Sequence, residues 1–211
     1  MDAIVQYFSD FTWIKAIDLA GLVLGLVYLW LEFKASIWLW LVSVIMPVVH
    51  GYLYWARGLY ADFGMEVYYV LAAVYGYAMW RWNKSASDKE VRPITRFPLR
   101  RALPVALVGL ALWGIIYWIL ITWTDSSVPV CDSFTTALSM VALWALAQKY
   151  AEQWLLWLVV DAVCTVLYIY KQIPFTAGLY AFYTVMAVLG YRSWLKKMQS
   201  SVSSDLLDVV E

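Results

Sequence analysis

Charged residues are scarce in this chain of 211 residues: 14% are Asp, Glu, Lys or Arg, whereas 64% are apolar. Soluble domains carry roughly 25% charged and about 45–50% apolar residues. This balance argues against a water-soluble enzyme and predicts an integral membrane protein. The formal net charge is zero, so there is no basic excess to neutralise the phosphates of a nucleic acid.

Histidine and cysteine are rarer still, with one histidine and two cysteines in the whole chain. A zinc site needs several His or Cys ligands, and nucleophilic catalysis needs a base beside its nucleophile. No phosphate loop of the GxxxxGK type occurs, which argues against ATP-driven transport by this chain alone. We therefore expect no catalytic residues, no metal and no cofactor, and we do not expect an enzyme.

Apolar residues gather in seven runs that are long enough to cross a bilayer, for which about 20 residues suffice. The fifth run is the shortest and the weakest by hydropathy. The sequence therefore predicts an all-α integral membrane protein with seven transmembrane helices. The predicted spans are residues 14–31, 37–55, 61–82, 102–123, 133–147, 154–170 and 175–194.

Positive charge is spread unevenly over the connecting segments. Segment 81–101 contains seven Lys and Arg, and Arg192, Lys196 and Lys197 lie at or just after the end of the last span. Because cytoplasmic loops are enriched in Lys and Arg, both segments are predicted to be cytoplasmic, with twelve cations inside and three outside. The amino terminus is then outside and the carboxyl terminus inside. The Ser-rich, acidic tail 199–211 is predicted to be a disordered cytoplasmic end.

The two halves of the chain repeat each other at an offset of 114 residues. Residues 66–80 laid over residues 180–194 give six identities in fifteen positions, including Gly76 with Gly190. Apolar helices also resemble each other by composition, but matched Trp, Gly and Asp residues favour a duplication. Further matches at the same offset are Asp18 with Asp132, Trp40 with Trp154, Tyr54 with Tyr168 and Arg57 with Lys171.

Each copy has three spans, so two copies joined directly would have opposite orientations in the membrane. The charge distribution instead gives both copies the same orientation. A fourth helix outside the repeat restores the orientation, so the predicted fold is three plus one plus three with parallel repeats. Such repeats place a substrate site at their interface near the bilayer midplane, which indicates transport. The predicted segments are the first repeat 1–82, the basic cytoplasmic loop 83–101, the linking helix 102–123, the second repeat 124–198 and the tail 199–211.

Asp161 is the most informative polar residue at membrane depth, where a carboxylate is costly and indicates function. Trp154, Trp157, Asp161 and Tyr168 are spaced by three, four and seven residues and share one helical face. Aromatic rings with a carboxylate suit a planar organic cation, so this face is predicted to bind substrate. Helix packing with an interfacial aromatic belt is the alternative, which Trp154 could join.

The remaining candidates are polar or aromatic side chains in other predicted spans. Pro47 occupies the repeat position of Asp161 and frees a backbone carbonyl, which permits a hinge for gating. His50 is predicted to hydrogen-bond either a ligand or only a neighbouring helix, and a proton relay with the buried carboxylates is a further alternative. The other predicted binding residues are Glu66, Tyr69 and Tyr183, the repeat equivalent of Tyr69.

Three stretches resemble the Pnu family of bacterial vitamin transporters: KYAEQWLLW at 149–157, GLYAD at 58–62, and YGY at 75–77 followed by Trp80. The resemblance covers all seven predicted spans. It implies a fold related to the SWEET transporters and a homotrimer in the bacterial inner membrane. It also implies facilitated diffusion of a vitamin that a cytosolic kinase then traps by phosphorylation.

Thiamine is the predicted substrate, because Asp161 stands where the nicotinamide riboside branch of the family has Asn four residues after Trp. Its thiazolium and aminopyrimidine suit aromatic stacking and two acidic groups, which Asp161 and Glu66 supply. Nicotinamide riboside, also a planar cation, is the alternative, and riboflavin ranks third because it has no cation. A membrane scaffold without transport is the competing class. The expected partners are a small cationic vitamin, membrane lipid and further copies of the chain, and no nucleic acid.

Overall fold

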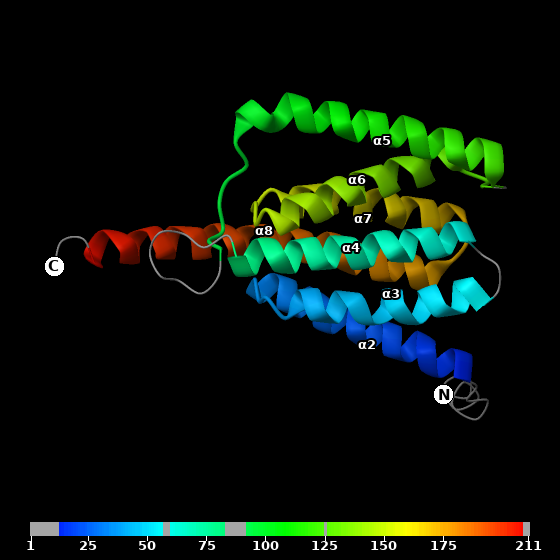
Figure 1. The fold of residues 1–211 in the computed structure, drawn as a ribbon, viewed down its shortest axis with the longest axis horizontal. Helices are drawn as coiled ribbons and strands as arrows, with labels where there is room; N and C mark the ends of the chain where they lie inside the picture. Colours follow the sequence, from blue (N-terminus) through cyan, green and yellow to red (C-terminus); the bar gives the residue numbers. More distant parts are fainter. Residues whose placement is uncertain (1–12, 57–59, 83–91, 125, 209–211) are drawn as a thin grey trace. The chain divides into compact units, whose positions relative to one another are not determined.

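The computed structural model describes residues 13–56, 60–82, 92–124 and 126–208, which form seven α-helices and one 3₁₀ turn (Figure 1). The all-α prediction is confirmed, and each predicted span coincides with one helix. The elements are α2 Trp13–Lys34, α3 Leu39–Ala56, α4 Tyr60–Trp82, η1 Leu99–Arg101, α5 Ala102–Trp123, α6 Pro129–Ala147, α7 Gln153–Tyr170 and α8 Pro174–Asp208.

Three helical stretches are long and apolar enough to cross a membrane by length and composition alone: Leu99–Trp123, Pro129–Ala147 and Gln153–Tyr170. A shorter apolar stretch covers Leu39–Tyr52. Tyrosines and Glu66 lower the hydropathy of α4. Composition therefore marks the helices of the carboxyl-terminal half more clearly than those of the amino-terminal half.

The last helix, α8, is longer than the sequence indicates. It continues to Asp208 through the segment for which a disordered tail was predicted, so that prediction is wrong as far as Asp208. Neither Gly nor Pro follows Gly190. Extending a helix that is already formed is easier than nucleating one, and no breaker stops the span at the membrane surface. Residues 209–211 lie outside the described part of the chain.

The chain divides into two compact units, Met1–Tyr77 and Ala78–Glu211. In the first unit α2 packs against α3. In the second, α5 packs against α6, α6 against α7 and α7 against α8. Each helix of the second unit therefore packs mainly against its neighbours in sequence, as short connections dictate.

A tryptophan is packed directly against a glycine in each unit. In the first unit, a Cβ added to Gly76 would lie 2.3 Å from the Trp40 ring, and in the second, one added to Gly190 would lie 2.6 Å from the Trp154 ring. Both rings are buried, with 2% of their surface exposed. Only glycine permits this approach, and the two contacts are related by the 114-residue offset.

The turn before each of these tryptophans also has the same backbone in both units. Ala35 and Lys149, which are 114 residues apart, adopt positive φ angles of 55° and 57°. The Ser36 amide donates to the Leu31 carbonyl at 2.9 Å, and in the second unit the Tyr150 amide donates to the Ala145 carbonyl at 3.0 Å. Both turns are Schellman caps with a non-glycine residue in the left-handed position. The shared geometry supports the duplication inferred from the sequence.

Segment 92–98 is fastened to the turn between α6 and α7. Its Thr95 forms a β-bridge with Tyr150, through hydrogen bonds of 3.1 Å and 3.0 Å to the flanking residues. Glu152 anchors the same segment, because its carboxylate accepts the Phe97 amide at 2.7 Å and pairs with Arg96 at 3.2 Å. The end of the basic loop nearest α5 thus has a fixed position in the second unit.

Lys149, in the same turn and outside the helical spans, is a buried cation. Its ammonium donates to the Arg92 carbonyl at 2.7 Å and lies 4.3 Å from the centre of the Trp80 ring. Burial, together with the charges of Lys197 and Arg92, lowers the pKa of Lys149 to about 7. An unfolded lysine has a pKa of about 10.4.

The free energy of unfolding is therefore expected to rise between pH 7 and about pH 10, because in this window the unfolded chain keeps a proton that the folded chain has lost from Lys149. Lys149→Gln should remove this part of the rise. Lys196→Gln, which changes an exposed lysine of α8, should keep it. Thermal unfolding at pH 7, 8 and 9 measures the effect, and the same pH dependence in wild type and Lys149→Gln would contradict it.

Candidate functional site

Asp161 lies in the middle of α7 and is buried in the second unit, with 7% of its surface exposed. Within the described residues, its carboxylate accepts no hydrogen bond from another side chain. It interacts electrostatically with Tyr180 and Tyr183 of α8. A buried carboxylate that the protein itself leaves without a hydrogen-bond donor can receive a charged ligand.

Three tyrosine rings form a continuous aromatic cluster beside this carboxylate. Tyr168 of α7 stacks on Tyr180, with ring centres 5.2 Å apart and planes inclined by 16°. Tyr180 meets Tyr183 edge to face at 6.0 Å. The cluster joins α7 to α8 and contains two predicted binding residues, Tyr168 and Tyr183. Tyr180 joins them through contacts across two helices.

The two predicted tryptophans of α7 have different surroundings. Trp154 is packed in the core, where its ring covers Gly190 and meets Trp194 edge to face at 6.0 Å. It is a packing residue in this structure, and we do not include it in the candidate site. Trp157 is half-buried, and its buried indole N–H has no hydrogen-bond partner in the described part of the chain. It lies one helical turn before Asp161 and offers a donor to a ligand.

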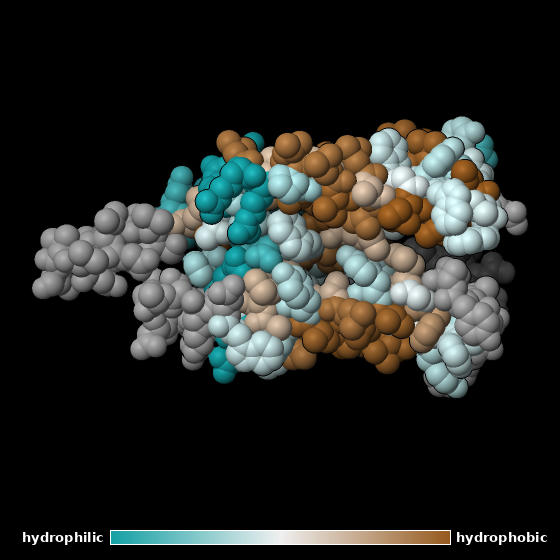
Figure 2. Space-filling view, turned by 45° about the horizontal axis from the view of Figure 1, so that its top comes forward, coloured by the Kyte–Doolittle hydropathy of each residue, from teal (hydrophilic) through white to brown (hydrophobic). Residues whose placement is uncertain are grey.

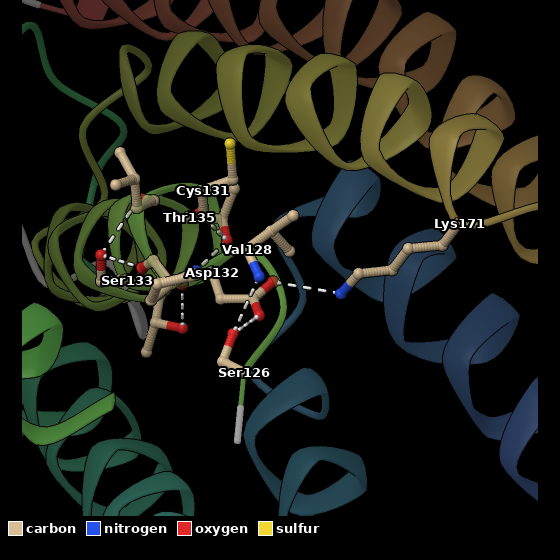
Figure 3. A network of polar contacts seen from close by, with 10 residues as sticks. Ser126, Val128, Cys131, Asp132, Ser133, Thr135 and Lys171 are labelled. Carbon is tan, nitrogen blue, oxygen red and sulfur yellow. Dashed lines mark hydrogen bonds and ion pairs between the residues drawn. The ribbon is translucent and has the colours of Figure 1, made fainter. Parts of the chain in front are cut away.

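A polar network holds the beginning of α6 against the end of α7 (Figure 3). Lys171 lies 3.4 Å from the Asp132 carboxylate, which also accepts the Ser126 hydroxyl at 2.7 Å. One turn further along α6, the Thr135 hydroxyl donates to the Cys131 and Asp132 carbonyls at 3.0 Å and 3.1 Å. The Lys171 contact joins the beginning of α6 to the end of α7 and gives the Asp132 carboxylate a partner of its own.

His50 and Glu66 lie close together in the first unit. They are two of the three residues of the alternative proton relay, and Asp161 is the third. His50 Nδ1 of α3 lies 3.7 Å from Glu66 Oε1 of α4. The His50 ring also lies 6.0 Å from that of Tyr54. Tyr69 is exposed on α4, meets Tyr68 edge to face at 5.6 Å and interacts electrostatically with Glu66. His50 therefore has a carboxylate partner within its own unit.

A cavity of about 380 Å³ lies between α2 and α3 in the same unit. Pro47 and His50 both line it, together with Tyr28 of α2. Helix α3 runs through Pro47 without interruption, although a proline there removes one backbone hydrogen bond. The predicted hinge residue therefore lines a cavity together with His50, next to a weakened point of its helix.

Together, the apolar helices and their packing define a multi-pass helical membrane protein. A family model described as nicotinamide mononucleotide transporter matches residues 15–196. The chain therefore belongs to this family, which is the Pnu family that its sequence resembles. As a member, it is an inner-membrane protein of several spans.

Several relatives are similar over most of the chain. The nicotinamide riboside transporter PnuC of Escherichia coli is 24% identical over 93% of this chain and 91% of its own length. The riboflavin/roseoflavin transporter RibM of Streptomyces davaonensis is 27% identical over 84% of this chain and 83% of its own. A crystal structure of the vitamin B3 transporter PnuC shares the fold, with a TM-score of 0.68, 24% identity and coverage of 94% of this chain and 87% of that one. Thiamine, the substrate predicted from Asp161, is less well supported by these relatives than the alternative, nicotinamide riboside.

Proposed function

We propose that this protein carries nicotinamide riboside across the inner membrane by facilitated diffusion and that a cytosolic kinase traps the vitamin by phosphorylation. The observation that carries the proposal is the buried Asp161 carboxylate beside the Tyr168, Tyr180 and Tyr183 rings. The pyridinium of nicotinamide riboside is a planar cation, which aromatic faces attract and a carboxylate neutralises in a medium of low dielectric. Its carboxamide oxygen suits the Trp157 indole N–H.

Thiamine is the second candidate, because Asp161 replaces the Asn of the nicotinamide riboside branch and a thiazolium is also a planar cation. Riboflavin has no cation, so it would leave the charge of the buried carboxylate unneutralised, which costs free energy. The two cationic vitamins therefore rank above riboflavin, and the similarity to the PnuC relatives supports nicotinamide riboside as the first candidate.

Calorimetry on the purified full chain with nicotinamide riboside, thiamine and riboflavin tests this ranking. We expect nicotinamide riboside to bind most tightly and riboflavin most weakly. Tighter binding of thiamine would replace the proposed substrate by the second candidate. If none of the three vitamins bound, transport of this class of substrate would be excluded.

We further propose the three plus one plus three architecture with parallel repeats, an external amino terminus and a homotrimeric assembly. The repeated Trp–Gly contacts and Schellman turns support the duplication. The arginines of segment 92–101 support a cytoplasmic location for that segment.

A cysteine introduced at exposed Arg100 should react with an impermeant maleimide only from the cytoplasmic side, and labelling from the outside would reverse the orientation. A monomeric mass in native mass spectrometry would refute the trimer.

A further inference from the structure

We propose that the groove between α5 and α6 is a binding site for an anionic phospholipid. In this assignment, an acyl chain lies in the groove and the phosphate lies at the arginines that precede α5. The site belongs to the second unit and is independent of the vitamin site.

The groove is a cavity of about 550 Å³. Ala102, Ala106, Gly109 and Trp113 line it from α5, so it follows one helical face over three turns, about 16 Å. Small side chains on this face leave the room that an acyl chain needs. On the α6 side, Ala137 and other apolar residues complete the wall.

The charged group and the tyrosine oxygen of the lining have partners already. One oxygen of the Glu152 carboxylate pairs with Arg96, and the other accepts the Phe97 amide. The Tyr150 hydroxyl accepts a hydrogen bond from Arg101 at 3.0 Å, and the Trp113 indole donates to Ser133 at 3.1 Å. Apart from the Trp144 indole, the other lining side chains are apolar, and a cavity with so apolar a wall does not favour water. Its chemistry matches a hydrocarbon chain.

The opening at the beginning of α5 is rich in positive charge. Arg101 is held at the groove through Tyr150, which lines it, and Arg96 is held through Glu152, which also lines it. Arg100 is exposed in the same turn. Figure 2 shows hydrophilic side chains near this end of α5 and a band of hydrophobic ones along the helix. Basic clusters beside grooves between spanning helices bind anionic lipid headgroups.

A phospholipid fits both parts of this surface, since its chain matches the apolar wall and its phosphate matches the arginines. No residue of α5 is buried within the chain itself, so the groove faces the surroundings of the protein and a bilayer lipid can reach it. A second copy of the chain could fill the apolar wall, but it would leave the positive charge at the opening without the anion that a lipid supplies.

The test uses the purified full chain with phosphatidylglycerol and phosphatidylcholine of identical acyl chains, and it counts bound lipids by native mass spectrometry. The wild type should bind phosphatidylglycerol more tightly. Gly109→Leu fills the groove and should abolish retention of both lipids. Gly114→Leu is the matched control, because it makes the same change on α5 where an added Cβ meets no atom within 4 Å. It should bind both lipids like the wild type.

The arginines are tested separately, so that the proposal does not depend on the folding of Gly109→Leu. Arg100→Gln combined with Arg101→Gln should weaken phosphatidylglycerol binding by about fivefold for each arginine and leave phosphatidylcholine unchanged. Arg192→Gln, an exposed arginine of α8, is the control for charge alone and should change neither lipid. Unchanged phosphatidylglycerol binding in Gly109→Leu or in the double arginine variant would overturn the proposal. Loss of an oligomer in Gly109→Leu with lipid binding intact would assign the groove to a second copy instead.

Discussion

Replacing Asp161 with alanine is expected to weaken binding of the cationic vitamin by roughly 30-fold to several thousand-fold. Removing one partner of a buried charge pair costs about 2–5 kcal/mol, which corresponds to this range of dissociation constants. Alanine removes both the charge and the oxygens of the side chain, whereas asparagine would restore the residue that the nicotinamide riboside branch carries at this position. Because the carboxylate accepts no side-chain hydrogen bond within the described residues, the variant is expected to fold. Quenching of tryptophan fluorescence by nicotinamide riboside measures the affinity.

Asp132→Ala is the matched control for this experiment, since it makes the same substitution on the adjacent helix. The Asp132 carboxylate has its own partners in Lys171 and Ser126, so its loss should change stability and leave vitamin affinity close to that of the wild type. Equal affinities in wild type and Asp161→Ala would remove Asp161 from the site while leaving the membership of the family intact. Equal losses in Asp161→Ala and Asp132→Ala would indicate a general effect of negative charge rather than a contact.

Replacing Gly190 with alanine is expected to destabilise the second unit by about 1–3 kcal/mol, the usual effect of overpacking. The added Cβ would lie 2.6 Å from the Trp154 ring, which is buried and held by Trp194, so neither group can move aside easily. Gly178→Ala is the control on the same helix, because an added Cβ there meets no atom within 4 Å. It should leave stability unchanged or raise it, since alanine favours helix more than glycine does.

The duplication makes the same experiment available in the first unit. Gly76→Ala brings a Cβ within 2.3 Å of the Trp40 ring and should be as destabilising as Gly190→Ala, whereas Gly64→Ala, in open space, should not be. Thermal unfolding in detergent gives all four values. A neutral Gly190→Ala, or a Gly178→Ala as harmful as Gly190→Ala, would contradict the packing described for Trp154.

The helices could be predicted from the sequence because each span is a long apolar run. The offset of 114 residues matched Trp40 with Trp154 and Gly76 with Gly190, but the contact between the two residues in each unit is seen only in the structure. Side-chain roles were harder to predict. Periodicity put Trp154 and Asp161 on one face of α7, but it could not tell a ring packed against Gly190 from one facing a ligand, because that depends on the neighbouring helix. Tyr180 was missed for the same reason, although its spacing of three residues from Tyr183 was a usable signal. The helix at 199–208 was missed because polar composition was taken as disorder despite the absence of helix breakers.

Facilitated diffusion of a planar cationic vitamin that Asp161 recognises can be measured as uptake of radiolabelled nicotinamide riboside into proteoliposomes that contain only the purified protein, with no ATP and no ion gradient. We predict that internal nicotinamide riboside rises to the external concentration and stops there, and that Asp161→Ala slows this equilibration strongly at low substrate concentration. Absence of uptake above protein-free liposomes, or accumulation beyond the external concentration, would contradict facilitated diffusion by this protein.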